Sequence, residues 1–285
     1  MKTSTIMALD ILSSDLSNVY CDVVKNHFRI YYANWLPAKT LDLGDYGMLQ
    51  GNIFIKLGNV KNDFLELKGA VIQEFTEQSK NHYEFTSSRD VEIKTTAKGT
   101  VGNIGITANA TLGIQFHSEN SVFFNAAECT TKFISNKAEI GKIIMNLYRE
   151  NRWRFSYVLV TDIIKAGRTL IAISSAENSS ISFEASSPNI SHIDLANASL
   201  GLSITSESNI GFKVVSEDGL DLLMGLCKVK NSFPPFTSPE FKPTNFGLNM
   251  ASLINERMID ENWQTKLTNS EGQNDQDLNF GQLGY

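Results

Sequence analysis

The hydrophobic positions along the chain follow the period of strands more often than that of helices. The longest example covers residues 104–116, where apolar side chains take every second position and small or polar side chains take the others. A period of two over this length predicts one long strand with an apolar face and a polar face. The apolar row consists of Ile104, Ile106, Ala108, Ala110, Leu112, Ile114 and Phe116.

A second strand-rich stretch contains three apolar runs separated by short polar joints. The runs are Tyr157–Lys165, Arg168–Ser174 and Ser180–Ala185. Because only Ala166 and Gly167 separate the first two runs, the pattern predicts a tight turn there and an antiparallel meander of all three. The two later runs and the alternating stretch 192–205 carry another apolar row, which comprises Leu170, Ala172, Ile181, Phe183, Leu200, Leu202 and Ile204.

Helical spacing occurs in two further places. Apolar residues three and four positions apart predict a helix over Ser4–Asn26 and another over Lys137–Asn151. Asn136, with Glu139 three residues later, predicts an N-cap and a capping box for the second helix. Further strands are expected at His27–Leu36, Met48–Leu49, Asn52–Leu57, Phe64–Phe75, Ser121–Ala126, Cys129–Ile134, Ile210–Val215 and Leu220–Val229.

These elements predict an α+β fold that is β-dominated, with a large twisted antiparallel sheet and a few packed helices. The composition changes at Asn231, after which four of the six prolines fall in one short stretch, typical of an extended linker or a surface strap. A polar helix is expected over Asn249–Leu267, followed by a loose polar tail. We therefore expect a β-rich main domain, residues 1–230, and a C-terminal segment, residues 231–285.

Charge and hydropathy narrow the function classes. The formal charge is −6, from 25 Lys and Arg against 31 Asp and Glu, which disfavours nucleic acid as a partner because nucleic-acid binding rests on phosphate neutralisation. Asp10 and Asp15 interrupt the N-terminal apolar residues, unlike a secretory signal. No apolar run reaches the roughly 18 residues of a transmembrane helix. We expect a cytoplasmic protein.

The sequence shows no motif for catalysis. The four histidines have no HExxH spacing, and no serine lies in a GxSxG sequence. The pairs Asp42/Asp45 and Asp218/Asp221 lie beside glycines, where turn capping is commoner than metal binding. We therefore expect a protein that is not an enzyme, with no catalytic residue, no cofactor and no metal. The widely spaced Cys21, Cys129 and Cys227 are expected to be buried, reduced thiols.

One basic group stands out in the acidic chain. Arg149, Arg152 and Arg154 flank Trp153 at the end of the second predicted helix. Such a group either contacts lipid headgroups or forms a solvated helix end that the helix dipole favours. The alternating strands have two meanings as well: the apolar side packs on a core in a half-exposed sheet, or faces lipid in a bilayer.

The late strands resemble those of the gasdermin pore-forming domain. The resemblance rests on YVLVTDIIKAGRTLIAIS from Tyr157, SSISFEAS from Ser179 and GFKVVSEDGLDLLMGLCKVK from Gly211, with the helix Lys137–Asn151 preceding them in the same order. The segment DYGMLQG from Asp45 is similar to an earlier gasdermin region. Together these segments cover a minor part of the chain. Two features depart from the family: the acidic net charge, and a first cysteine at Cys21 where bacterial members often have a lipid-modified one near the start.

The resemblance implies a specific activity. Gasdermins are held inactive by a C-terminal segment; a protease removes it, and the pore-forming domain then oligomerises on acidic lipid and inserts two β-hairpins per subunit. Here the hairpin candidates are Tyr83–Phe116 and Thr169–Thr205, and the cover is Asn231–Tyr285. The implied partners are copies of the chain itself, membrane lipid and an activating protease, and the implied roles are those of a toxin in cell death and antiviral defence.

A second hypothesis needs no membrane. Long strands of moderate hydrophobicity and an extended Pro-rich arm also suit a non-catalytic assembly subunit, such as a component of a phage particle or an injection apparatus, that joins its neighbours by strand addition.

Overall fold

The computed structural model describes residues 4–37, 39–68, 71–78, 80–87, 90–99, 108–185, 203–216, 219–230 and 239–244. Its helices are α1 (Ser4–Phe28), α2 (Val60–Asp63) and α3 (Lys137–Arg149), with a 3-10 turn at Leu65–Leu67. The first strands are β1 (Tyr32–Ala33), β2 (Asp45–Gln50), β3 (Ile53–Asn59), β4 (Glu74–Thr76), β5 (Asn81–Thr86), β6 (Val91–Gly99), β7 (Ala108–Phe116) and β8 (Val122–Ile134). The later strands are β9 (Val158–Ala166), β10 (Arg168–Ser174), β11 (Ser179–Ala185), β12 (Ser203–Ser208), β13 (Ile210–Ser216), β14 (Leu220–Lys230) and β15 (Glu240–Pro243).

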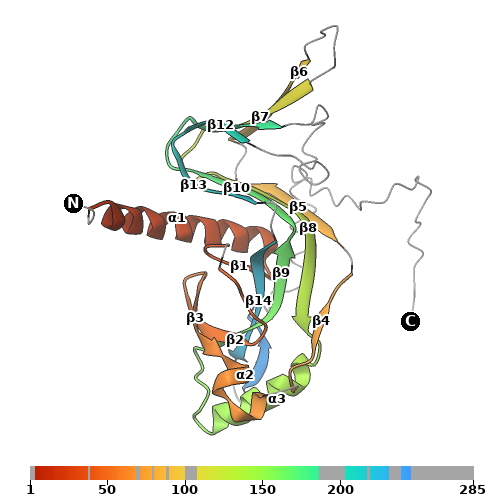
Figure 1. Ribbon diagram of the computed structural model, residues 1–285. Helices are drawn as coiled ribbons and strands as arrows, with labels where there is room; N and C mark the ends of the chain where they lie inside the picture. The colour runs from red at the N-terminus through yellow and green to blue at the C-terminus, as the bar shows by residue number, and fades with distance from the viewer. Residues whose placement is uncertain are drawn as a thin grey trace, which may run out of the picture.

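The strands form two antiparallel sheets, which confirms the predicted β-dominated α+β fold. The main sheet has eleven strands in the central order β1-β14-β9-β8-β10-β13, and the second sheet has four strands in the order β12-β11-β7-β6. Figure 1 shows α3 at one end of the main sheet, α1 lying across it, and the second sheet folded back over the other end.

Both sheets are built from the same four chain segments, which we call strand lines. Line 1 consists of β4, β5 and β6; line 2 of β7 and β8; line 3 of β9, β10 and β11; and line 4 of β12, β13 and β14. Each line pairs with the next in the main sheet and pairs with it again in the second sheet. The second sheet is therefore the continuation of the main sheet beyond a sharp fold.

The predicted meander at 157–185 is wrong, because β9 and β10 do not pair with each other. They lie end to end along β8, with Lys165 opposite Thr130 and Arg168 opposite Ala127. At Ala166–Gly167 the line continues along β8 in one register, without a hairpin turn: the Gly167 N–H donates to the carbonyl of Ala127 at 2.9 Å, and Glu128 opposite has φ 53°. The chain therefore keeps travelling in one direction, and β11 reaches the second sheet.

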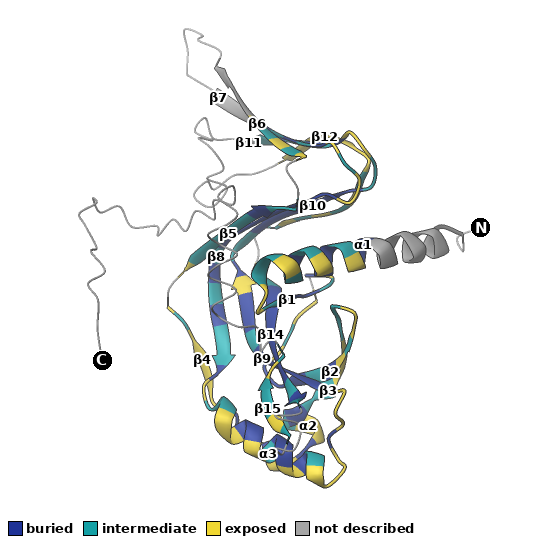
Figure 2. Cartoon of the chain, turned by 180° about the vertical axis from the view of Figure 1, so that it is seen from behind, coloured by how far each residue is buried: buried dark blue, intermediate teal, exposed yellow. Residues whose placement is uncertain are grey.

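Three hydrophobic clusters hold the fold together. One lies between α3 and the main sheet, and a second lies under α1, where Tyr20, Cys21 and Val24 are fully buried. The third, which we call the corner cluster, lies between the two sheets and consists of Leu112, Ile114, Phe116, Phe123, Leu170, Ala172, Ile181 and Phe183. Figure 2 shows the buried residues along the main sheet and exposed residues on the outer side of α3.

Several expected elements have other forms. The strand predicted at His27–Leu36 is mostly absent because α1 continues through Phe28 and only the short β1 follows. The strand predicted at Phe64–Phe75 is a 3-10 turn and the beginning of β4, because Phe64 and Leu67 fold inward onto the α3 cluster. The two strands expected between Ser121 and Ile134 are the single strand β8.

The predicted cap of α3 also differs. The Asn136 side chain accepts no hydrogen bond from the helix. Instead it accepts one from the Gln73 N–H at 3.0 Å and donates to the Val71 carbonyl at 2.8 Å, so it holds the segment before β4. Its amide also donates to the Glu139 carboxylate at 2.9 Å, in place of the backbone N–H that would donate in the expected capping box.

Part of the Pro-rich segment belongs to the main sheet. β15 pairs antiparallel with β14, from Cys227 opposite Pro243 to Lys230 opposite Glu240. Phe241 packs on the cluster under α3, against Gly141, where an added Cβ would lie 3.2 Å from the Phe241 ring. The predicted helix Asn249–Leu267 lies outside the described residues.

We expect Gly47→Ala to lower the free energy of unfolding by more than about 2 kcal/mol, because no side chain fits at the bulge between β2 and β3. A Cβ on Gly47 would lie 1.9 Å from the Ile55 carbonyl oxygen. Gly113→Ala is the matched control, since its nearest neighbour would be an ordinary 3.7 Å away. Urea unfolding of both variants tests this; equal losses would contradict it.

Candidate functional site

The second sheet is joined to the main sheet by four bends, one in each strand line. The first bend lies between β5 and β6, the second is at 117–121, the third is at 175–178 and the fourth is the single residue Asn209. The strands on the far side form two hairpin arms, β6 with β7 and β11 with β12. The arms lie side by side because β7 pairs with β11 from Ala110 to Phe116.

Strand register divides the second sheet into an apolar and a polar face. Residues directly opposite each other point to the same side of a sheet. One cross-strand row contains Thr95, Leu112, Phe183 and Ile204, and the next contains Ile93, Ile114, Ile181 and, on the outer strand, Glu207. Between them lies a row of Lys94, Gly113, Ser182 and Ser206, which points to the other side.

The apolar face is covered by the main sheet. Leu112, Phe116 and Phe183 have no solvent exposure, and Ile114 and Ile181 have almost none. The floor beneath them is Phe123 of β8 with Leu170 and Ala172 of β10. The two sheets thus pack face to face at the corner cluster, and the polar row stays outside.

The structure brings seven of the fourteen predicted apolar residues into this one place. Leu112, Ile114, Phe116, Ile181 and Phe183 line the apolar face, while Leu170 and Ala172 belong to its floor. Ile204 ends the row at the outer strand and is 40% exposed. Ala108 and Ala110 lie on β7; Ile104, Ile106, Leu200 and Leu202 lie outside the described residues.

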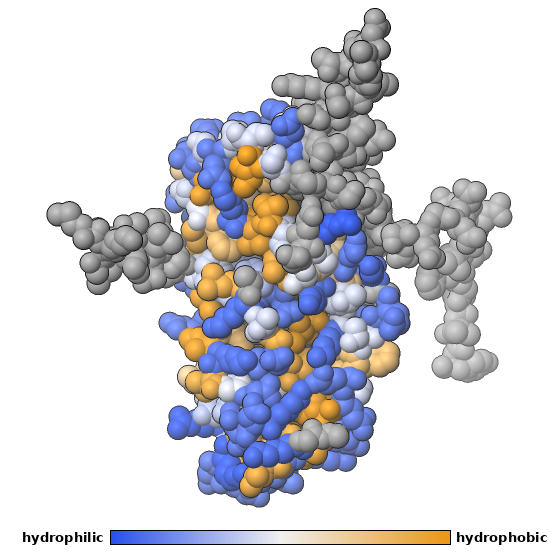
Figure 3. Space-filling view, viewed as in Figure 1, coloured by the Kyte–Doolittle hydropathy of each residue, from blue (hydrophilic) through white to orange (hydrophobic). Residues whose placement is uncertain are grey.

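Hydrophobic surface elsewhere is broken up. On the side drawn in Figure 3, hydrophobic residues form patches interrupted by hydrophilic ones. The outer face of the β2–β3 hairpin is one such area, with Met48, Ile55 and Leu57 exposed. By contrast, the main sheet covers Leu112, Ile114, Phe116, Ile181 and Phe183, the described centre of the apolar surface that the strand pattern predicted.

The predicted arginine group lies at the end of the molecule opposite the second sheet, beside α3 (Figure 1). Arg152 is paired with the carboxylates of Glu66 and Glu150. Arg149 donates to the side-chain oxygen of Asn146 at 3.1 Å, and Arg154 lies over the Tyr157 ring at 5.9 Å from its centroid. The arginines and the hairpin arms therefore do not form one surface.

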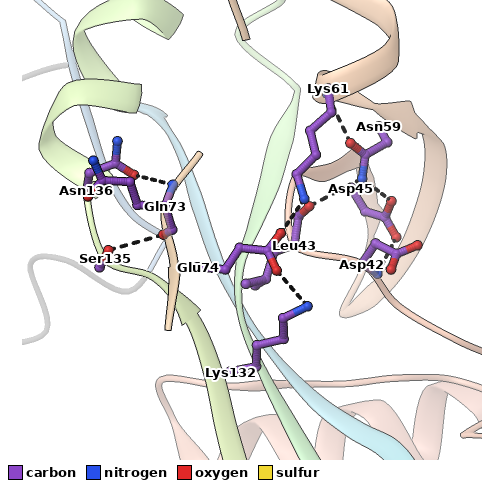
Figure 4. A network of polar contacts seen from close by, with 10 residues as sticks. All are labelled: Asp42, Leu43, Asp45, Asn59, Lys61, Gln73, Glu74, Lys132, Ser135 and Asn136. Carbon is purple, nitrogen blue, oxygen red and sulfur yellow. Dashed lines mark hydrogen bonds and ion pairs between the residues drawn. The ribbon is translucent and has the colours of Figure 1, made fainter. Parts of the chain in front are cut away.

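A polar network near α2 and α3 holds the lower part of the body together (Figure 4). The buried Asp45 carboxylate is paired with Lys56 at 2.7 Å and accepts hydrogen bonds from the Asn59 amide and the Asp42 N–H. Glu74 on β4 pairs with Lys61 and Lys132. Every one of these groups has a structural partner, so the network ties elements together and offers no nucleophile.

The turn-capping role predicted for the Asp pairs is confirmed at Asp45, whereas Asp221 bonds to a segment far away in the sequence. Asp45 closes its own turn, because its carboxylate accepts from the Asp42 N–H at 3.0 Å and its N–H donates to the Asp42 carbonyl. Asp221 accepts from the Leu41 N–H at 2.9 Å; Asp218 lies outside the described residues. Within the described ranges, no group of three or more metal-ligating side chains is arranged to hold a metal ion.

The three cysteines are free and buried, as expected. Burial raises the pKa of the Cys129 thiol to about 12, and burial together with nearby Asp22 raises the pKa of Cys21 to about 12. Nucleophilic chemistry needs the thiolate form of cysteine. With pKa values this high, both thiols stay protonated at neutral pH.

In the part of the chain that the structure covers, no helix is both long enough and apolar enough to cross a membrane. Comparison with models of known protein families gives no match, and neither does comparison with curated proteins.

The main sequence signal that periodicity alone misses is a repeated turn motif. The tripeptide Glu-Asn-Ser occurs at 119–121 in the second bend and again at 177–179 at the end of the third. After glycine, Asn is among the residues that most readily take the left-handed conformation, so the repeat marks two sharp changes of direction. Taken together, the two copies would have indicated that neighbouring lines bend at the same level.

We expect the fold to lose stability as the pH rises above 9. The folded-state pKa of Cys129 is about 12 against an ordinary value of 9.0, so the unfolded thiol ionises first. The stabilisation is fully present below pH 9 and is lost toward pH 12, at about 1.4 kcal/mol per pH unit for each such thiol. Urea unfolding at pH 8, 9.5 and 10.5 measures this, and Cys129→Ala must flatten the dependence; an unchanged slope would refute it.

Proposed function

We propose that the protein is an autoinhibited pore-forming protein, similar in mode of action to the gasdermins, that passes from solution into a membrane as a homo-oligomer. The observation that carries the proposal is the second sheet: two adjacent hairpin arms with one apolar and one polar face, each arm continuing two neighbouring strands of the main sheet. Swinging the arms out at the bends would present the apolar face to lipid and leave the polar face toward water.

The energetics explain why the arms stay folded in water. Exposing the five buried arm residues Leu112, Ile114, Phe116, Ile181 and Phe183 would cost on the order of 10 kcal/mol, at about 2 kcal/mol for each buried side chain. Because each 1.4 kcal/mol is about a factor of ten, the open form would be extremely rare in water. Lipid supplies an apolar environment that replaces the corner cluster, so the membrane is the natural place for opening.

The unpaired outer edges fit assembly with further copies. Among the described residues, β5 and β6 pair on one side only, as do β12 and β13. With four alternating lines, line 1 and line 4 run in opposite directions. Line 4 of one copy can therefore pair antiparallel with line 1 of the next, and the same contact repeats from copy to copy.

The C-terminal segment lies where it would hinder such a contact. β15 pairs with β14 on the edge away from β9, which is the outer edge of line 4. It is also fixed by Phe241 against α3. Among the described residues, a chain cut before β15 would be held by a four-residue ladder, by the Thr244 N–H donating to the Leu226 carbonyl at 2.9 Å and by this aromatic contact, so proteolysis within 231–238 is the proposed activating step.

The proposal assigns lipid contact to the second sheet and not to the arginines. Arg152 is already paired with two carboxylates, and the group lies at the opposite end of the body. A membrane entered by the arms would not meet it.

We expect a chain cut within 231–238 to release dye from liposomes of anionic lipid, and the uncut chain to release little. A specific protease site inserted there makes the cut, and the same insertion left uncut is the control. The uncut chain keeps β15 tethered to the sheet. Fluorescence dequenching measures the leakage; no increase after cutting would reject autoinhibited pore formation.

A pair of variants tests which face meets lipid. Ile204→Asp places a charge on the apolar face at a position that is 40% exposed, so the soluble fold tolerates it. In lipid an Asp costs less than the roughly 2–4 kcal/mol of a Lys or Arg, but the cost recurs in every copy of the oligomer, so we expect leakage to fall by at least tenfold. Ser206→Asp, two residues away on the polar face, is the matched control and should leave leakage within about twofold. Equal effects would contradict the assigned faces.

The unpaired edges also favour a second function, that of an assembly subunit which polymerises by strand addition without a membrane. Light scattering after size-exclusion chromatography separates the two. A monomer that assembles only after cutting supports the pore-forming protein, whereas regular polymers of the intact chain support the assembly subunit.

A further inference from the structure

Three of the four bends contain an asparagine in the left-handed backbone conformation. Asn120, Asn178 and Asn209 have φ values of 61°, 56° and 53°. They lie in lines 2, 3 and 4, at the same level of the fold. Strand residues have negative φ. Each asparagine must therefore change φ before its line can run straight from the main sheet into the second sheet.

Serine side chains fasten the second bend to the third. The fully buried Ser174 hydroxyl accepts a hydrogen bond from the Ser121 N–H at 2.9 Å and donates one to the Ser118 carbonyl at 2.8 Å. The backbone of Ser174 adds a bond in each direction, donating to the carbonyl of Ser121 and accepting from the N–H of Asn120. Lines 2 and 3 are thus locked together where they bend.

The outer bends are fastened in the same way. The N–H and the hydroxyl of Ser175 both donate to the Asn209 carbonyl at 2.9 Å, which joins line 3 to line 4. The hydroxyl of Ser87 accepts from the Val122 N–H at 2.6 Å, which joins line 1 to line 2. No bend can straighten alone without breaking bonds to its neighbour.

We propose that the bends of lines 2, 3 and 4 form one hinge, held in the folded-back position by left-handed asparagines, and that it straightens as a unit so that each of these lines becomes one continuous strand. Its use in membrane entry rests on the proposed function, but the hinge itself is a property of the chain in water. Asparagine suits the role because it tolerates the left-handed region without preferring it as glycine does. The asparagines can therefore keep the lines bent and still allow them to straighten and bend again.

The hinge can be probed without a membrane by thiol labelling at position 172. Ala172 pairs with both neighbouring strands of the main sheet, and its side chain is covered by the second sheet in the corner cluster. In Ala172→Cys the introduced thiol becomes reactive when the arms swing out. The native Cys129 is buried under α1 in the main sheet and reports global unfolding in the same molecule. Mass spectrometry after labelling in mild urea gives the labelling rate of the introduced thiol and that of Cys129.

Two sets of substitutions move the hinge in opposite directions. Replacing Asn120, Asn178 and Asn209 by Val disfavours the bent form, since β-branched residues are outliers at positive φ. For each substitution we expect labelling of the introduced thiol to be about tenfold faster, relative to that of Cys129. The triple replacement by Gly should slow the relative labelling several-fold. Asn151→Val, at a residue with φ 58° just after α3, is the matched control and should leave the ratio unchanged.

The outcomes separate the hinge from the pore. Relative labelling that rises with Val and falls with Gly supports the hinge, even if no variant releases dye, in which case the pore-forming function fails on its own. Equal acceleration at the introduced thiol and at Cys129, or the same effect from Asn151→Val, overturns the hinge. If the Val variant does not fold, the Gly variant tests the hinge by itself. An unchanged ratio of labelling at position 172 to labelling at Cys129 would then falsify the proposal.

Discussion

The packing of the second sheet against the main sheet is the contact on which the architecture depends. Leu112, Ile114 and Phe183 are apolar residues on strands that would otherwise present a long hydrophobic face to water. A strand line that ran straight would leave this face uncovered. Folding all four lines back at one level buries it on Phe123 and Leu170 of the same lines.

Under the proposed function, this arrangement would let one sequence serve in two environments. In water the apolar face is buried in the corner cluster. In lipid the acyl chains would cover it instead. The polar row around Gly113 and Ser182 faces outward in the folded-back form and needs no rearrangement to remain in water. The free-energy difference between the folded-back and the extended form would then depend on the corner cluster and on the backbone at the bends. The clusters under α1 and α3 would not contribute to it.

The rest of the body serves as a stable base. The clusters under α1 and α3 do not involve the arms, and the network from Asp45 through Asn59, with Glu74 bridging Lys61 and Lys132, ties the far end together. Movement at the bends would leave these contacts intact. The strap β15 is attached to this base and lies on the edge that an adjacent copy would use.

The sequence pattern predicted most of the strands correctly, because side-chain alternation reflects the two faces of a strand whatever it packs against. The row from Leu112 to Phe116 and the density of Val and Ile in β9 are examples. The pattern could not predict partners. Ala166–Gly167 looks like a hairpin joint, yet the line continues through it in one register, because Lys165 and Arg168 on either side both pair with β8.

By itself the sequence determined which residues form the apolar face of each strand and which positions tolerate a left-handed backbone. Only the tertiary structure decided that Asn120, Asn178 and Asn209 lie at one level and that the row ending at Ile204 covers Leu170. The reason is physical: periodicity is encoded within a few residues, whereas strand register and the fold of one sheet over another depend on hydrogen bonds and contacts between residues far apart in the chain.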